Sequence, residues 1–332
     1  MESGRQKVTR KDVAREAGVS ETIVSYVLNK NRYVKEEKRQ RVLEVVEKLQ
    51  YHPNNIARAL HGKGSLQILF LAEELSSGYF SELVSQMSRD AYRRGYMISL
   101  CESQEEDEFV SQILSRQFDG LFVSASGVTD RELKLLVKSG IPMVLFLNRE
   151  ISCDLRDTVV VDTGLYEGSR ECVKHLVKNG CRNFVYLDKT GKQCDRDIHW
   201  KGFFDQIKES EITFAQEQRI SGCEDIKKLE KRLQLLLEKN PSVDAIVARY
   251  DNLAAVALSV AGRTGRKFDN DFISNYVSPA LTTVEIQKEE VAKSAMEALL
   301  SLIRHDGVDK KISFTARLVI RESTGKKCYC KQ

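Results

Sequence analysis

The sequence predicts an α/β protein in which a small all-α helix-turn-helix unit precedes a two-lobed domain built on parallel sheets. Residues 1–64 carry 14 Lys and Arg against 8 Asp and Glu, a net charge of +6, whereas the rest carries 38 against 40, a net of −2. From Ser65 onward, short apolar runs alternate with amphipathic helical segments, as in parallel sheets covered by helices. We therefore predict a first domain over residues 1–62 and a second over residues 63–332.

The first unit contains recognisable helix start and stop signals. Thr9 and Asp12 form a T-x-x-D capping pattern, and Gly18 permits a sharp turn. Ser20 is placed to cap a second helix, and a third helix is expected over residues 35–49. The apolar positions of the second and third helices predict one small core, made of Ile23, Val24, Val27, Leu28, Val42, Val45, Val46 and Leu49.

The second helix carries polar side chains on the face opposite its apolar stripe. These residues are Glu21, Thr22, Ser25, Tyr26 and Asn29. Two short helices joined by a tight turn form a helix-turn-helix, whose second helix enters the major groove of DNA. The net positive charge of this unit also favours a polyanion as its partner. An ordinary solvated surface is the alternative interpretation of the charge alone.

A short segment links the two domains. Pro53 ends the preceding structure, Asn54 can cap, and Gly62 ends a segment of barely two turns. Isolated helices of this length are marginal in water. We therefore expect a hinge helix over residues 54–61 that forms only when it docks on a partner.

The second domain alternates strands with helices along its length. The predicted strands cover residues 66–72, 96–101, 118–123, 142–147, 158–162, 184–188 and 245–248. The predicted helices cover residues 79–94, 105–116, 130–139, 165–178, 197–208, 224–239 and 252–262. Two such lobes enclose a cleft, and α/β sheets bind ligands at the carboxyl ends of their strands.

The N-terminal motifs resemble those of the lac/galactose repressor (LacI/GalR) family. The matching segments are VTRKDVAREAGVS at 8–20, VSYVLN at 24–29, YHPN at 51–54 and IARAL at 56–60. The resemblance implies a dimeric DNA-binding regulator whose Leu60, paired across the dimer, wedges into the minor groove. A plain apolar contact beneath the linker is the alternative role for Leu60. The candidate DNA-binding residues are Thr9, Ser20, Glu21, Thr22, Ser25, Tyr26, Asn29, Tyr33, Tyr51, Asn54, Ala57 and Leu60.

Two residues of the second helix predict an unusual operator sequence. The family commonly has Arg where this chain has Tyr26, and Tyr cannot make the bidentate contact by which Arg binds guanine. The carboxylate of Glu21 can accept a hydrogen bond from cytosine but repels phosphate. We therefore expect an operator that differs from the family's commonest one.

The second domain resembles the effector-binding domain of the same family, which is similar to periplasmic sugar-binding proteins. The matching segments are FDGL at 118–121, SGIP at 139–142, VVVD at 159–162, LTTV at 281–284 and VIREST at 319–324. The resemblance implies a small-molecule effector, a sugar or related metabolite. The candidate effector-binding residues are Tyr79, Phe80, Asn148, Arg149, Arg196, His199, Asp251 and Asp269.

Some of these positions have alternative interpretations. Asp251 could be only a helix cap, and Arg149 could be a surface residue. His199 stands where the family usually has a clamping Arg, and Arg196 is close enough in sequence to substitute for it. Between Gly262 and Phe268 the chain also has no room for the apolar strand of its relatives, so a strand of the second lobe is expected to be short or absent.

The composition and motifs weigh against other classes of protein. The eight cysteines are scattered and form no C-x-x-C, so we expect reduced thiols, no metal and no cofactor. No apolar run approaches the roughly 20 residues that span a bilayer, and no secretory signal is present, so we expect a cytoplasmic protein without membrane contact. G-x-G-x-x-G, P-loop and G-x-S-x-G motifs are missing, so we expect no enzyme and no catalytic residue. The other alternative, a sugar-binding protein without a regulatory role, does not explain the helix-turn-helix.

Overall fold

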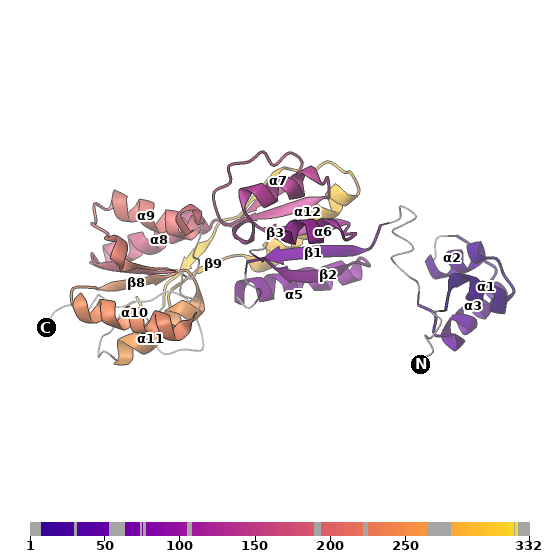
Figure 1. Ribbon diagram of the computed structural model, residues 1–332, viewed down its shortest axis with the longest axis horizontal. Coiled ribbons are helices and arrows are strands. Elements are labelled where there is room, and N and C mark those ends of the chain that lie inside the picture. The colour runs from indigo at the N-terminus through magenta and orange to yellow at the C-terminus, as the bar shows by residue number, and fades with distance from the viewer. Residues whose placement is uncertain are drawn as a thin grey trace. The chain divides into compact units, whose positions relative to one another are not determined.

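The structure is a computed structural model of the whole chain that separates into two compact units, Met1–Ser65 and Leu66–Gln332 (Figure 1). It describes residues 8–29, 32–52, 64–73, 75, 78–104, 108–188, 194–221, 225–263, 280–321 and 323–324. The predicted hinge helix at 54–61 lies outside the described residues, and so does the segment at 264–267 where a shortened strand is expected. We describe each unit by itself.

The first unit consists of α1 (Arg10–Ala17), α2 (Glu21–Asn29) and α3 (Glu36–Lys48). Thr9 forms the predicted capping box at the start of α1, since its hydroxyl accepts from the backbone N–H of Asp12 and the Asp12 carboxylate accepts from the backbone N–H of Thr9. Gly18 ends the helix with a left-handed φ of 63°, which glycine adopts without strain. The fully buried side chains of Val13, Val24 and Val42 join the helices in one core.

The second unit begins with a large lobe built on a parallel sheet. Within the described residues its strand order is β10-β5-β4-β3-β1-β2. The strands are β1 (Gln67–Ala72), β2 (Met97–Glu102), β3 (Gly120–Ser124), β4 (Met143–Leu147), β5 (Val159–Asp162) and β10 (Lys311–Ser313). The covering helices are α5 (Gly78–Arg93), α6 (Phe109–Leu114), α7 (Asp130–Lys138) and α12 (Lys288–Ile303), with a short η1 (Ala125–Gly127) after β3.

Alternate residues of β1 explain how helices cover both faces of this sheet. Ile68 and Phe70 belong to the core that includes α5 and α12, whereas Leu69 and Leu71 pack in the core that includes α6 and α7. Successive side chains of a strand point to opposite faces, so β1, which is apolar from Ile68 to Ala72, is buried on both.

The small lobe contains a second parallel sheet with the strand order β7-β6-β8 among its described strands. Its strands are β6 (Phe184–Leu187), β7 (Arg219–Ile220) and β8 (Ala245–Ala248). Its helices are α8 (Leu165–Lys178), α9 (Ile198–Glu209), α10 (Ile226–Lys239) and α11 (Asp251–Arg263), with η2 (Cys194–Arg196) before α9 and η3 (Gln216–Gln218) before β7. An antiparallel ribbon of β9 (Thr283–Glu285) and β11 (Arg317–Val319) packs beside α8.

The described chain passes between the lobes at three places: between β5 and α8, between β9 and α12, and between β10 and β11. The first and third of these crossings touch. Gly164 begins α8 with a φ of +78°, and a Cβ there would lie 2.5 Å from the backbone N of Ala316. This position therefore requires glycine both for its backbone conformation and for the close approach of the neighbouring crossing.

The α/β fold class predicted from the sequence is confirmed, and the predicted strands and helices of the second unit are found with boundaries shifted by a few residues at most places. The helix expected over 105–116 is shorter in the described residues, because α6 covers only Phe109–Leu114. The prediction missed α12 and the short strands β7, β9, β10 and β11.

Candidate functional site

The outward face of α2 is the candidate DNA-binding surface of the first unit. Glu21, Thr22 and Asn29 are exposed, and Ser25 and Tyr26 are half-buried. The hydroxyl of Ser20 accepts from the backbone N–H of Ile23 at 3.3 Å, so Ser20 caps α2 as the sequence predicts. The apolar side of the helix is held by buried Val24 and Val27. The helix thus presents its polar residues to solvent while its core side chains fix its orientation.

Contacts within this surface restrain some of its side chains. The amide of Asn29 donates to the backbone O of Ser25 at 2.8 Å and to its hydroxyl at 3.1 Å. The guanidinium of Arg32 lies 5.3 Å from the ring centroid of Tyr26, a distance typical of a cation–π contact. Arg32 therefore places a positive charge beside Tyr26. Tyr26 itself stands where the family commonly has Arg.

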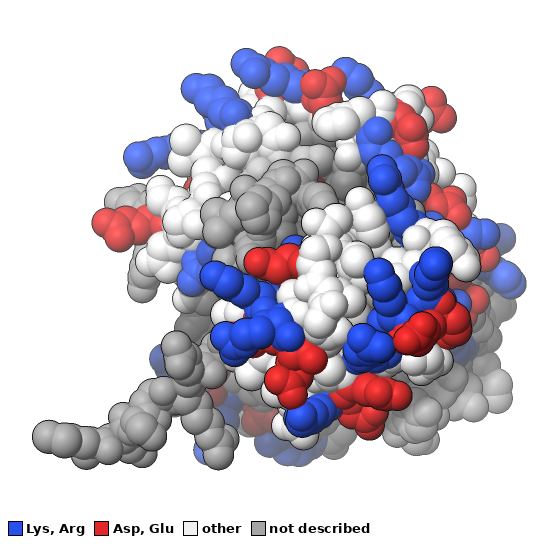
Figure 2. Space-filling model, turned by 90° about the vertical axis from the view of Figure 1, so that its right-hand side faces the viewer, with Lys and Arg blue, Asp and Glu red and all other residues white. Residues whose placement is uncertain are grey.

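Other predicted DNA-binding residues differ in their exposure. The side chain of Tyr33 is 91% exposed and accessible to a partner. Tyr51 is only 6% exposed and packs in the core of the first unit, so its side chain contributes to the stability of that unit. Asn54, Ala57 and Leu60 lie outside the described residues. On the face of the molecule drawn in Figure 2, Lys and Arg form several groups with Asp and Glu between them.

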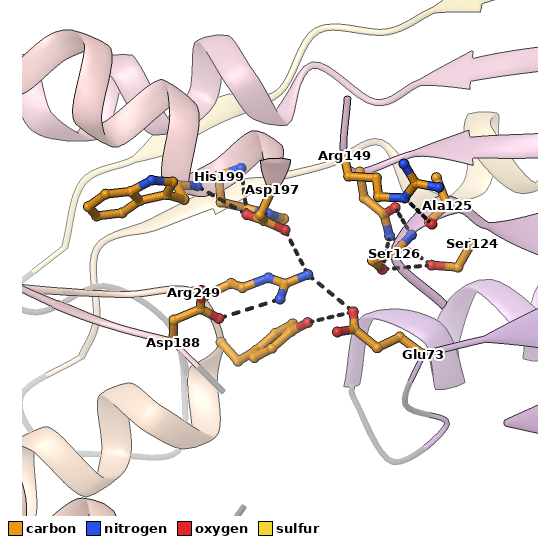
Figure 3. Close-up of polar contacts among 12 residues, drawn as sticks. Glu73, Ser124, Ala125, Ser126, Arg149, Asp188, Asp197, His199 and Arg249 are labelled. Carbon is orange, nitrogen blue, oxygen red and sulfur yellow. Dashed lines mark hydrogen bonds and ion pairs between the residues drawn. The ribbon is translucent and has the colours of Figure 1, made fainter. Parts of the chain in front are cut away.

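In the large lobe, Asn148 and Arg149 follow β4, and their side chains bind within their own lobe. Figure 3 shows the contacts of Arg149. The amide of Asn148 donates to the hydroxyls of Ser124 and Ser126 at 2.7 and 2.8 Å. Arg149 is 1% exposed and donates to Asp130 and to three backbone carbonyls, of Ala125, Val128 and Glu150. The structure therefore corrects the alternative of a surface position for Arg149, whose guanidinium organises the loop between β3 and α7.

A second arginine joins the two lobes near this point. Arg196, in η2 of the small lobe, lies 3.0 Å from the carboxylate of Asp130 in the large lobe and also donates to the hydroxyl of Ser152. Beside it, Arg149 and Asp197 form an isolated antiparallel bridge. The predicted Arg196 thus contacts the opposite lobe, but its donors are directed at protein acceptors.

The lobes also meet at Arg249, which directly follows β8 and is 2% exposed (Figure 3). Its guanidinium lies 2.8 Å from Asp197 and 3.4 Å from Asp188, both in the small lobe. It also lies 3.2 Å from Glu73, which follows β1 in the large lobe, and over the ring of Tyr250 at 4.7 Å. A buried cation is tolerated here because carboxylates surround it.

Asp188 connects Arg249 to a second buried arginine. One oxygen of Asp188 lies 3.4 Å from Arg249, and the other lies 3.4 Å from Arg219 of β7. The guanidinium carbon of Arg219 is 3.7 Å from the ring centroid of Trp200, and its Nη1 lies 2.6 Å from Asp195. This arrangement holds two guanidinium groups on opposite sides of one fully buried carboxylate.

Asp197 is the other buried carboxylate of the cluster, and it also caps α9. It accepts from the backbone N–H groups of His199 and Trp200 at 2.9 and 3.1 Å. Burial acts to raise its pKa, but Arg249, His199 and the hydrogen bonds outweigh burial and lower the pKa to about 2. Asp197 is therefore charged throughout the physiological range. The predicted His199 lies 3.2 Å from it through Nδ1.

Of the remaining predicted effector residues, only Phe80 has a described side chain, and it packs away from this cluster. Phe80 is 4% exposed and packs edge-on against Phe70 in the large-lobe core. The helix α11 begins at Asp251, so Asp251 lies inside the helix rather than before it. The side chains of Tyr79 and Asp251 and the whole of Asp269 lie outside the described residues, and their roles stay predictions.

The prediction missed the residues at the centre of the cluster, namely Glu73, Asp188, Asp197, Arg219, Arg249 and Tyr250. A usable signal was present in the sequence. Glu73 directly follows the predicted first strand, Asp188 ends another, and Arg249 follows a third. Polar residues at the carboxyl ends of parallel strands converge on one edge of a sheet, where α/β proteins bind ligands.

Within the described residues, no group of three or more His, Cys, Asp or Glu is arranged to hold a metal ion. No helix of that part of the chain is both long and apolar enough to cross a membrane.

Comparison with known proteins matches both units to one family. Residues 9–54 match the bacterial regulatory proteins of the lacI family, and residues 65–301 match the periplasmic binding proteins and sugar binding domain of the LacI family. The transcriptional repressor PurR of Mannheimia succiniciproducens is 30% identical over 96% of this chain and 99% of its own. The ribose operon repressor of Halalkalibacterium halodurans is 28% identical over 95% of this chain and 97% of its own.

A solved structure shows the same fold over nearly the whole chain. The lac repressor dimer bound to operator and the anti-inducer ONPF has a TM-score of 0.79 and 20% sequence identity, covering 96% of this chain and 99% of that one. The two family matches together span most of the sequence, from the helix-turn-helix to the lobes. This chain is therefore a DNA-binding transcriptional regulator, not an enzyme, and belongs to the LacI family of bacterial regulatory proteins.

Proposed function

We propose that this regulator binds a pseudopalindromic operator as a homodimer and that a small polar metabolite, bound between the lobes, controls this binding. The contact of buried Arg249 in one lobe with Glu73 in the other carries the proposal, because a ligand at this point bears on how the lobes close. Relatives that repress the ribose operon or carry the name PurR support a metabolite effector. A protein that acts on bacterial DNA works in the cytoplasm.

The exposed polar face of α2 supports the DNA-binding half of the proposal. In a helix-turn-helix dimer, the two second helices enter successive major grooves on one side of the duplex. In such a dimer, the spacing between the α2 helices of the two protomers depends on the hinge segments at 54–61. A short helix is marginal by itself, so a small change in spacing decides whether it folds.

Binding to the DNA upstream of the protein's own gene tests the function directly. Fluorescence anisotropy with that DNA, with and without sugars, sugar acids and nucleobases, is expected to show tight binding that at least one metabolite changes. Random DNA of the same length is the control. Equal binding to both DNAs contradicts operator recognition, and a metabolite that binds by calorimetry without changing DNA affinity contradicts ligand control.

The hinge has its own test in Leu60→Ala, with Leu43→Ala as the matched control on the exposed side of α3. If Leu60 inserts into the minor groove, its removal is expected to weaken operator binding by about a few kcal/mol and to leave binding to random DNA nearly unchanged. Leu43→Ala is expected to change neither. Equal losses of affinity for operator and random DNA in Leu60→Ala rule out insertion of Leu60 into the minor groove.

A further inference from the structure

Glu73 reaches across the lobe boundary to two donors of the small lobe. Its carboxylate lies 3.2 Å from Nη2 of Arg249 and accepts from the hydroxyl of Tyr250 at 3.4 Å. Both donors directly follow β8, whereas Glu73 directly follows β1. Figure 3 shows the Glu73 carboxylate directed from its own lobe toward Arg249. A carboxylate thus occupies the position between the lobes where an effector is expected.

Among the described residues of the small lobe, two buried arginines face two buried carboxylates without Glu73. Arg219 and Arg249 are 3% and 2% exposed, and they face Asp188 and Asp197, which are 0% and 4% exposed. Glu73, at 19% exposed, adds one further negative charge from the other lobe. When the lobes separate, Nη2 of Arg249 keeps its contact with Asp197 but loses the contact with Glu73, and the hydroxyl of Tyr250 loses the acceptor that Glu73 supplies. A buried donor deprived of its acceptor favours any ligand that restores one.

Tyr186 of β6 is another buried donor of the small lobe, and its ring packs against Trp200 and Phe203. Its side chain is 1% exposed, and its hydroxyl has no hydrogen-bond partner among the described residues. Burial raises the pKa of Tyr186 well above its ordinary value, and the charges of Asp188 and Asp197 raise it further. The hydroxyl therefore stays protonated and keeps a proton to donate. At the boundary the small lobe presents the donors of Arg249 and Tyr250, so it suits a ligand that brings an acceptor.

We propose that the Glu73 carboxylate occupies the effector site when no ligand is bound. The effector is then a small metabolite whose carboxylate replaces that of Glu73 at Arg249 and Tyr250. This inference rests on the proposed function, because it names the class of effector for the interlobe site. A single negative charge replaces a single negative charge, so the net charge beside Arg249 and Tyr250 stays the same. A phosphate dianion brings an additional charge and fits this balance less well. Nη2 of Arg249 and the hydroxyl of Tyr250 are the two donors from which such a carboxylate accepts in place of Glu73.

If Glu73 competes with the ligand, its replacement changes ligand affinity. In Glu73→Gln the side chain at position 73 becomes neutral, so it binds Arg249 more weakly and no longer repels an incoming carboxylate. The affinity for carboxylate ligands is expected to rise by about tenfold, as the loss of one charged contact implies. In Tyr250→Phe the ring remains but a donor is lost, so the affinity is expected to fall.

The experiment is calorimetric titration of the full-length protein with glucuronate and gluconate, and with glucuronamide and glucose as neutral counterparts. Glu150→Gln is the matched control, since Glu150 also pairs across the boundary, with Lys201, but does not contact Arg249. We expect the acids to bind, the neutral compounds to bind at least tenfold more weakly, and only Glu73→Gln to bind the acids more tightly than the unmodified protein.

Several results overturn the inference. Unchanged or weaker acid binding in Glu73→Gln excludes competition, and an equal gain in Glu150→Gln shows that any loosening of the lobes suffices. If neutral sugars or nucleobases bind and alter DNA affinity while the acids do not, the carboxylate inference fails and the proposed function stands. If no compound of any class binds, both fail.

Discussion

Arg149 and Arg196 share one carboxylate. Nη1 of Arg149 lies 2.7 Å from one oxygen of Asp130, and Nη1 of Arg196 lies 3.0 Å from the other. The side chain of Arg149 is 1% exposed and that of Arg196 is 33% exposed, although both face the same partner. Comparing the two arginines therefore shows how burial changes the contribution of an ion pair to stability when the carboxylate partner is the same.

Arg149→Ala is expected to destabilise the second unit by about 3–5 kcal/mol, because it leaves carbonyl groups and a carboxylate without their buried donor. Arg196→Ala is expected to reduce stability by about 1 kcal/mol or less, since water replaces an exposed partner. Scanning calorimetry of each variant measures the difference in thermal midpoint. Similar losses in both variants would show that burial does not govern this site.

The capping box of α1 predicts that substitutions of Thr9 lower stability according to whether they keep the side-chain hydroxyl. Thr9→Ala removes the acceptor for the Asp12 backbone N–H and is expected to destabilise the first unit by about 1 kcal/mol. Thr9→Ser keeps the hydroxyl and is expected to retain most of that stability. Circular dichroism during thermal unfolding, together with anisotropy on operator DNA, checks both properties. A stable Thr9→Ala that still loses operator affinity would indicate a direct DNA contact instead.

Tyr26 is expected to influence which operator the protein prefers. Tyr26→Arg introduces a guanidinium that can bind guanine through two hydrogen bonds, so the preferred site is expected to gain guanine at one symmetric position. Selection of binding sites from random DNA, carried out with both proteins, measures the change. Leu43→Arg, at an exposed side chain of α3 that is not among the candidate DNA-binding residues, is the control. Identical consensus sites for Tyr26→Arg and the parent protein contradict a base-reading role.

The pKa of Asp197 gives a prediction for acid stability. Its value of about 2 in the folded protein lies below the ordinary 3.8, so the folded state favours the charged form. The corresponding stability, about 2 kcal/mol, is fully present above pH 4 and is lost as the pH falls toward 2. Asp197→Asn is expected to be less stable at neutral pH and to lose less stability over that acid range. Thermal midpoints between pH 5 and pH 2 test this, with Asp195→Asn as the control at an exposed neighbour. Parallel pH profiles for Asp197→Asn and the parent protein contradict the assignment.

The alternation of apolar runs and helical segments was enough to predict the layered α/β fold, because long buried strands and amphipathic helices carry strong periodic signals. The predicted elements end at residue 262, although Val291, Ala295 and Leu299 have helical spacing that is sufficient to identify α12. The strands β7, β9, β10 and β11 have two or three residues each. Runs that short show no periodicity and become strands through the pairing that a neighbour supplies.

The site was harder to predict than the fold. The order of strand ends in the sequence places Glu73 and Arg249 at the edges of two different sheets, but nothing in the sequence specifies how the two lobes face each other. The resemblance also pointed to Arg149, whose side chain binds within the large lobe although its backbone pairs with Asp197 of the small lobe. Charge balance around a buried group depends on tertiary distances, and these come only from the structure.

The crossings between the lobes have a consequence for synthesis of the chain. The edge strand β10 pairs with β5, and Leu299 of α12 packs so closely on Gly120 that a Cβ there would lie 2.8 Å from it. The large lobe therefore needs residues from both ends of the second unit, whereas the β7-β6-β8 sheet lies within residues 184–248. Contacts so distant in sequence form late. In a nascent chain α5 covers only part of one apolar sheet face until α12 leaves the ribosome, and the small-lobe sheet is the part that can close first.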